Sequence, residues 1–129
     1  MSFILDTDHC IAILRGHLDI RSKIDSTTPL FITAITVSEL IYGAYKSQRP
    51  EHHLAQVELL IESVTVLPFD TSAGRRCGAL KDSLRRTGNL IAEPDLQIAS
   101  ITLENLLPLV THNQKHFDRI PRLELVDWL

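Results

Sequence analysis

Three carboxylates in this chain have the residue type and placement for metal-ion chemistry. Asp6 ends a short apolar run, Glu39 lies near the start of an expected helix, and Asp95 follows Pro94 at the start of another. If the fold brings them together, their mutual repulsion raises their pKa values and destabilises the site unless a cation neutralises them. Mg²⁺ takes oxygen ligands and activates water against phosphate esters. The pattern therefore predicts a metal-dependent phosphodiesterase.

Each carboxylate also has a purely structural explanation. Thr36 and Glu39 have the spacing of a capping box, in which the Glu side chain reaches back to the N-cap amide. Asp95 lies in a first helical turn, where negative charge interacts favourably with the helix dipole, and Asp6 could cap the helix that follows it. Glu39 points away from the apolar side of its own helix, so it faces either solvent or a cleft. For Glu39, the sequence supports capping and chemistry about equally.

The elements that must position these residues alternate between strands and helices. This alternation predicts an α/β fold of three layers (α/β/α) around a mostly parallel central sheet of about five strands, in a single domain over residues 1–129. The expected strands are 2–5, 30–33, 64–67, 109–111 and 123–126. The expected helices are 8–15, 17–25, 37–46, 50–63, 71–87, 94–103 and 114–119.

The sheet itself places two of the three carboxylates. Ligands of open parallel sheets collect beyond the carboxyl ends of the strands. Asp6 ends the first strand and Glu39 lies one helical turn beyond the second, so both should overhang the same edge. Asp95 follows a helix rather than a strand, and this rule does not place it.

Composition limits the function classes. A net charge of −3 argues against a protein that coats nucleic acid, but a nuclease stays open because bound Mg²⁺ adds positive charge at its site. Cys10 and Cys77 form no metal-binding pair and are expected to be buried small residues in a reducing cytoplasm. Without a signal peptide or a long apolar run, we expect a cytoplasmic protein with no membrane partner.

Four motifs in order, with the tail at 119–128, resemble those of PIN-domain ribonucleases and specifically of the VapC toxins of VapBC toxin–antitoxin pairs. The motifs are FILDTD at 3–8, TVSELIYG at 36–43, EPDLQIA at 93–99 and LVTHNQKHF at 109–117. The resemblance implies a PIN-like fold and an endoribonuclease that depends on Mg²⁺, with Mn²⁺ as a substitute. It also implies an RNA substrate, an antitoxin partner that reaches into the active site, and a homodimer or a larger toxin–antitoxin assembly.

Carried over residue by residue, the resemblance makes Asp6, Glu39 and Asp95 the metal ligands and catalytic acids. Asp6 and Asp95 would hold Mg²⁺ directly, Glu39 would be a further ligand, and a metal-activated water would cleave the RNA phosphodiester bond. Glu39 or Asp95 would take the proton.

One motif departs from the family pattern. Many members have a fourth acid where this chain offers Asn113, with His116 and Asp118 nearby. Asn113 can orient water or phosphate by hydrogen bonding but supplies no charge, so the sequence leaves open whether one or two ions bind. We expect Thr111 to orient the acids with its hydroxyl.

The sequence alone does not exclude three alternatives to a nuclease. Asp6-Thr7-Asp8 after a strand resembles the nucleophile motif of haloacid-dehalogenase-type phosphatases. A receiver-like signalling domain would use Asp70 as phosphoacceptor with Lys115 as its cationic partner. The missing fourth acid also leaves room for a catalytically weak PIN-like binding protein.

Several other residues invite an interpretation. His112 and His116 are a weak candidate for a zinc site. The basic stretch at 75–86 could contact RNA, although a solvated helix face is the default. Tyr42 and Tyr45 could line a groove for a partner helix, and Trp128 is expected to anchor the C-terminus.

Overall fold

The computed structural model describes residues 1–129 and contains one five-stranded parallel sheet with the strand order β3-β2-β1-β4-β5. The strands are β1 (Phe3–Leu5), β2 (Leu30–Thr33), β3 (Thr65–Leu67), β4 (Leu109–Val110) and β5 (Leu125–Val126). The helices are α1 (Thr7–Leu14), α2 (Ala34–Tyr45), α3 (Pro50–Ser63), α4 (Thr71–Arg86), α5 (Glu93–Asn105) and α6 (Gln114–Phe117). The expected three-layer α/β fold is confirmed.

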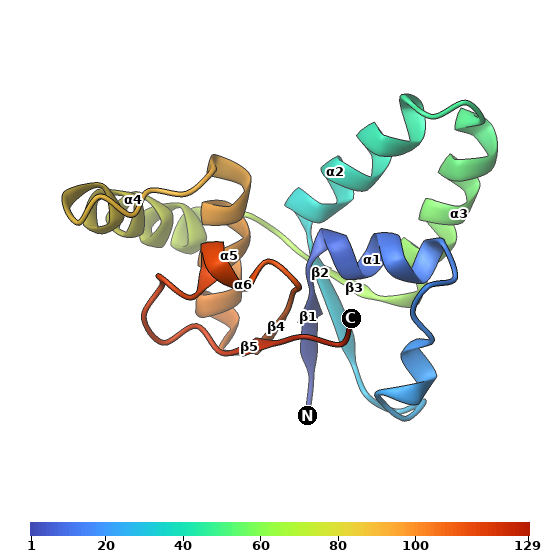
Figure 1. The fold of residues 1–129 in the computed structure, drawn as a ribbon, viewed down its shortest axis with the longest axis horizontal. Helices are drawn as coiled ribbons and strands as arrows, with labels where there is room; N and C mark the ends of the chain where they lie inside the picture. Colours follow the sequence, from blue (N-terminus) through green and yellow to red (C-terminus); the bar gives the residue numbers. More distant parts are fainter.

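Helices cover both faces of the sheet. Figure 1 shows α1, α2 and α3 on one side of the strands and α4, α5 and α6 on the other. Each side has its own apolar core. One joins Leu5, Ile32 and Val110 to Leu40 and Val57 of the covering helices. The other contains the largest fully buried side chain, that of Phe117, together with residues of β1, α4 and α5.

The central strand β1 explains why the sheet positions chemistry at one edge. Ile4 and Leu5 are completely buried because the two sides of β1 face the two cores. β1 pairs with β2 through Phe3 and Leu30 and with β4 through Ile4 and Leu109. Since all three strands run the same way, the residues that follow them meet at one carboxyl edge.

The start of α2 differs from the expectation. The helix begins at Ala34 rather than at residue 37, and the cap is Thr33, whose hydroxyl accepts the amide N–H of Thr36 at 3.2 Å. The capping box between Thr36 and Glu39 is therefore wrong. A strand that ends in Thr supplies the cap itself, so the helix needs no connecting loop.

The segment expected as a helix over 17–25 is also different. It contains only a short 3₁₀ turn, Ile20–Ser22, capped by the Asp19 carboxylate. By contrast, α3 has the expected bounds, with Pro50 in its first turn. No helix is long and apolar enough to cross a membrane.

Candidate active site

Asp6 lies where β1 passes directly into α1, and its carboxylate is held at both oxygens. Oδ1 accepts the backbone N–H of Thr7 at 2.8 Å, and Oδ2 accepts the hydroxyl of Thr111 at 2.7 Å. Thr111 follows β4, the neighbour of β1, and is completely buried. Asp6 is thus a helix cap, as its sequence position allowed. It is also fixed to the adjacent strand end.

Burial gives Asp6 an unusual electrostatic environment. Only 5% of the residue is exposed. Burial, together with the charges of Asp8 and Asp95, raises the pKa of Asp6 to about 6, against the hydrogen bonds from Thr111 and Thr7. The ionised carboxylate is costly here because water cannot solvate it and two other acids repel it. Burial is the largest cause, Asp8 contributes more than Asp95, and Glu39 is not among the causes, so the expected mutual repulsion of Asp6, Glu39 and Asp95 is only partly present.

Glu39 reaches the same edge from α2. Its Oε1 accepts the hydroxyl of Thr7 at 2.7 Å, and that hydroxyl also lies 3.0 Å from the hydroxyl of Thr36. Leu40 and Ala44 of the same helix are each only 4% exposed, whereas Glu39 is exposed. Glu39 therefore faces the cleft beside Asp6 rather than its own helix N-terminus.

Asp95, in the first turn of α5, completes the group. The amide of Asn113 lies 3.5 Å from Asp95 Oδ2, and His116 Nδ1 lies 3.1 Å from the same oxygen. Asn113 and His116 also contact each other at 2.9 Å. The segment that lacks the fourth acid thus provides two nitrogen groups beside Asp95. Asp118 caps the end of α6 instead and is exposed.

The donor set suits a hard divalent cation. All three expected ligands are carboxylates, and the buried Asp6 is destabilised by negative neighbours that a cation would neutralise. The side chains are not gathered into a finished cage, because no three His, Cys, Asp or Glu residues are arranged to hold a metal ion. Glu39 is engaged with Thr7, and Asp95 is engaged with His116 and Asn113. Binding would therefore require these two acids to change partners.

A groove begins at Glu39 and runs between α1, α2 and α3. Its volume is about 1040 Å³, and Tyr42, Arg15 and Lys46 are among its lining residues. Tyr42 is 65% exposed, and the Lys46 ammonium lies 4.9 Å from the centre of its ring. Tyr42 lines a groove, as the sequence interpretation allowed, and the partner helix stays a prediction. Tyr45 is equally exposed but does not line it.

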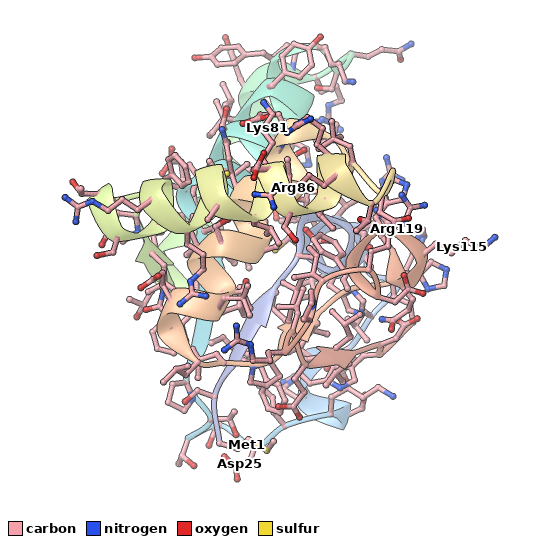
Figure 2. All side chains as sticks on the ribbon, turned by 90° about the vertical axis from the view of Figure 1, so that its left-hand side faces the viewer. Met1, Asp25, Lys81, Arg86, Lys115 and Arg119 are labelled. Atoms are coloured by element: carbon pink, nitrogen blue, oxygen red, sulfur yellow. The ribbon has the colours of Figure 1, made fainter.

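The basic stretch on α4 does not form a free cationic surface. Arg76 is paired with Glu104, Lys81 with Glu93, and both Arg85 and Arg86 with Asp82. Figure 2 shows Lys81 and Arg86 on α4, which crosses the face opposite to the groove helices. This pairing favours the solvated helix face over an RNA contact.

Two minor alternatives lose their geometric basis. Asp70 caps α4 by accepting the N–H of Ala73 at 2.9 Å, and Lys115 extends away from the body of the molecule (Figure 2). The receiver-like pair is therefore wrong. His112 and His116 bond to different carboxylates, those of Asp127 and Asp95, so they do not converge on one zinc ion.

The sequence interpretation anticipated the Thr111 hydroxyl but missed two other groups that hold the acids, the Thr7 hydroxyl and the His9 imidazole. Thr7 contacts Glu39, and the buried His9 contacts Asp8 at 2.8 Å. The signal for Thr7 was its place between two carboxylates at a strand end. His9 had no such signal, because its second partner is Trp128, at the other end of the chain.

The comparisons with known proteins agree with this geometry. The family model described as "PIN domain" matches residues 3–123. The tRNA(fMet)-specific endonuclease VapC of Salmonella typhimurium is 38% identical over 99% of this chain and 98% of its own length. Ribonuclease VapC2 of Haemophilus influenzae is 32% identical over 100% and 99%.

Solved structures show the same fold. The DNA-bound VapBC of Salmonella typhimurium superposes with a TM-score of 0.92 at 36% identity, covering 100% of this chain and 99% of that one. VapBC-1 of Haemophilus influenzae superposes with a TM-score of 0.88 at 33% identity, covering 99% and 98%. The phosphatase and receiver alternatives are excluded by these matches. The chain belongs to the PIN-domain family and, within it, to the VapC ribonucleases, the toxin components of VapBC toxin–antitoxin pairs.

Proposed function

We propose that this chain cleaves RNA with Mg²⁺ held by Asp6, Glu39 and Asp95, and that Mn²⁺ can replace Mg²⁺. The observation that carries the proposal is the buried Asp6 carboxylate, whose pKa is raised to about 6 by burial and by Asp8 and Asp95. An ionised carboxylate that is buried beside other acids lowers the stability of the fold. Its presence at this position is therefore better explained by a role in binding a cation.

We assign a different role in the reaction to each residue of the site. When bound, the divalent ion supplies Lewis-acid activation of water and neutralises the scissile phosphate. Asp6 holds its ligand position because Thr7 and Thr111 fix both of its oxygens. Asp95 would have to release His116 and Asn113 to hold the ion, and these two side chains would then be free to contact the phosphate.

Glu39 is the residue we propose as proton acceptor. When the contact between its Oε1 and the Thr7 hydroxyl is released, as ion binding requires, its carboxylate would be free to take a proton from the attacking water. Its exposure keeps it accessible to the substrate. Asn113 supports the phosphate by hydrogen bonding in the place of a fourth acid, in line with a single high-affinity ion.

For the substrate we propose tRNA(fMet). Two relatives that match almost the whole chain, from Salmonella typhimurium and Shigella flexneri, carry the name tRNA(fMet)-specific endonuclease. Other relatives are named only as ribonucleases, so the tRNA is the narrower part of the proposal. Its experiment is cleavage of total RNA and of purified tRNA(fMet) by the full chain.

Mg²⁺ should support cleavage, and EDTA should abolish it. Asp6→Asn and Asp95→Asn should be inactive, and Ser38→Ala should serve as an active control because Ser38 is exposed on the same helix as Glu39. Cleavage that persists in EDTA would falsify the metal proposal. Cleavage of other RNAs but not of tRNA(fMet) would reject only the proposal that tRNA(fMet) is the substrate. If the protein binds its antitoxin but cleaves no RNA, it is the catalytically weak PIN-like binding protein instead.

We also propose that an antitoxin segment lies in the groove between α1, α2 and α3. Glu39 lines the groove but Asp6 and Asp95 do not, so its occupant would contact one acid of the cluster, and the cations Arg15 and Lys46 favour an acidic partner. Lys46→Glu should weaken inhibition by the antitoxin without lowering the activity of the free toxin. Unchanged inhibition would place the antitoxin elsewhere. The proposed homodimer can be tested on the same samples by light scattering.

A further inference from the structure

The geometry points to His9 as a positioning residue that holds Asp8 beside the acid cluster and fastens the C-terminal tail to it. The inference concerns the same site and rests on the proposed function. His9 lies in the first turn of α1, one position beyond Asp8, and is 0% exposed. Nothing in the proposed reaction uses its imidazole, yet both ring nitrogens are bonded.

The two bonds fix the protonation of the ring. The backbone N–H of Trp128 donates to His9 Nε2 at 3.1 Å, so Nε2 is an acceptor and carries no proton. The proton is therefore on Nδ1, which donates to Asp8 Oδ1 at 2.8 Å. This geometry corresponds to one tautomer, with a main-chain group on one side of the ring and a carboxylate on the other, and Asp127 Oδ1 also lies 3.5 Å from Nε2.

Asp8, which His9 holds, also contacts the residues around the acid cluster. Its other oxygen, Oδ2, accepts the backbone N–H of His112 at 2.9 Å and lies 3.4 Å from the hydroxyl of Thr111. The same hydroxyl donates to Asp6 at 2.7 Å and accepts the N–H of Asn113 at 3.0 Å. Asp8 thus ties the start of α1 to the segment after β4, which carries both Thr111 and Asn113.

The C-terminal tail is tied to the same network. Asp127 accepts a hydrogen bond from His112 Nδ1 at 2.8 Å, and the Trp128 ring packs on Phe3 with centroids 5.0 Å apart at 66°. In Figure 1 the chain leaves β5 and returns across the strands to end below α1. β5 has only two residues and lies at the edge of the sheet, so these contacts of the tail help to hold it.

A buried histidine with satisfied nitrogens could also be a packing residue with no effect on the reaction. The two bonds of His9 separate these explanations, because different substitutions remove different bonds. An Asn side chain places its amide near the position of Nδ1, so His9→Asn keeps a donor for Asp8 and loses the acceptor for Trp128. A Gln side chain reaches the position of Nε2, so His9→Gln keeps the acceptor for Trp128 and loses the donor for Asp8.

The test measures kcat and KM for RNA cleavage with Mg²⁺, and Tm for the metal-free protein. His9→Gln should lose about 10–100-fold in kcat with little change in KM, because outer groups that orient ligands have effects of this size, and its Tm should fall no further than that of His9→Asn. His9→Asn should stay within about threefold of the wild-type kcat on the same reasoning, but with a lower Tm. Phe3→Leu is the control. It loosens Trp128 and lowers Tm without touching Asp8, so its kcat should match the wild type.

A kcat that follows Tm across the three variants would overturn the positioning role. A second measurement is independent of activity: long-range ¹⁵N–¹H correlation spectra of the metal-free protein should show His9 protonated at Nδ1 alone. Protonation at Nε2 would also overturn the inference. Wild-type protein that cleaves no RNA with Mg²⁺ would instead reject the proposed function, and the spectrum would still decide the role of His9 in holding Asp8.

Discussion

The two halves of the acid cluster are built differently. The inner half, Asp6 and Asp8, is held by hydrogen bonds from groups that belong to the folded core: Thr111, His9 and two backbone amides. The outer half, Glu39 and Asp95, is held by side-chain contacts alone, to Thr7, Asn113 and His116. The inner half is preorganised by the fold, whereas the outer half can change partners when a ligand arrives.

This difference has an energetic consequence. A substitution in the inner half removes either a buried hydrogen bond, which lowers stability, or the unfavourable buried charge of Asp6, which raises it. Either substitution should change stability and activity together. A substitution in the outer half removes interactions near the surface, so it should change activity with little effect on stability. The first three of the following predictions compare one residue from each half.

The largest effect should come from removing one metal-binding charge. Asp6→Asn and Asp95→Asn should each lower kcat/KM for RNA cleavage by about a thousandfold, because several kcal/mol of charge stabilisation in the transition state are lost. The measurement is cleavage at saturating Mg²⁺. A loss confined to Asp6→Asn would show that the outer half does not take part in the reaction.

The next effect separates the two halves by stability. The folded pKa of Asp6, about 6, lies above the ordinary value of 3.8. Between these two values the folded metal-free protein binds more protons than the unfolded chain, so its free energy of unfolding falls as pH rises. Above pH 6 the ionised Asp6 costs roughly 3 kcal/mol.

Asp6→Asn should therefore stabilise the metal-free protein by up to roughly 3 kcal/mol at pH 7.5. The amide can still accept the N–H of Thr7 and can donate to the Thr111 hydroxyl. The gain should shrink as the pH falls from 7 toward 4, where the wild-type acid is already protonated. Urea unfolding at several pH values measures it. Asp95→Asn should give a much smaller gain, and an equal gain would mean that the halves do not differ.

Two threonines provide a milder comparison. Thr111→Val removes a fully buried hydroxyl that donates to Asp6 and accepts from Asn113. It should cost about 1–3 kcal/mol of stability and about 10–100-fold in activity. Thr7→Val frees the exposed Glu39 and should lower activity by a smaller factor, with less than about 1 kcal/mol lost. The two variants can be compared by thermal unfolding and initial cleavage rates. A larger loss of stability for Thr7→Val would reverse the assignment of the halves.

The positions of Asp6 and Glu39 could be predicted from the sequence, whereas Asp8 was not predicted as part of the cluster, and the reason for the success is topological. Asp6 ends a strand that the apolar run Phe3–Leu5 predicts, and parallel strands bring their carboxyl ends together. Glu39 could be placed at the same edge by the same rule. Asp95 could not, because it follows the helix α4 and a long turn rather than a strand. Only the resemblance of its motif to PIN-domain ribonucleases placed it there.

Thr111 was expected from its motif, but Thr7 and His9 escaped prediction because their partners are distant in the chain. The amide of Trp128 and the ring of His9 are 119 residues apart, and no local pattern links them. The start of α2 was missed for a different reason. A helix cap can be supplied by the last residue of a strand, as by Thr33, and the sequence then shows two equally good caps, Thr33 and Thr36.

The smallest effect is expected from restoring the fourth acid, which tests whether the outer half has too little negative charge to bind Mg²⁺ tightly. Asn113→Asp restores an acid beside Asp95, where Asn113 and His116 now contribute only nitrogen donors and acceptors. Because the added carboxylate attracts a cation and repels Asp95, the Mg²⁺ concentration for half-maximal activity should fall by a few-fold. The stability of the metal-free protein should change by less than about 0.5 kcal/mol, as for other partly exposed positions.

His116→Gln is the matched variant for this test, since it alters the other neighbour of Asp95 without adding charge. It should leave the Mg²⁺ requirement nearly unchanged, as titrations of activity and of Tm against Mg²⁺ can measure. An Asn113→Asp protein that needs more Mg²⁺, or that loses stability as a buried acid would, places residue 113 in the inner half. The boundary between the halves then moves from Thr111 to Asn113.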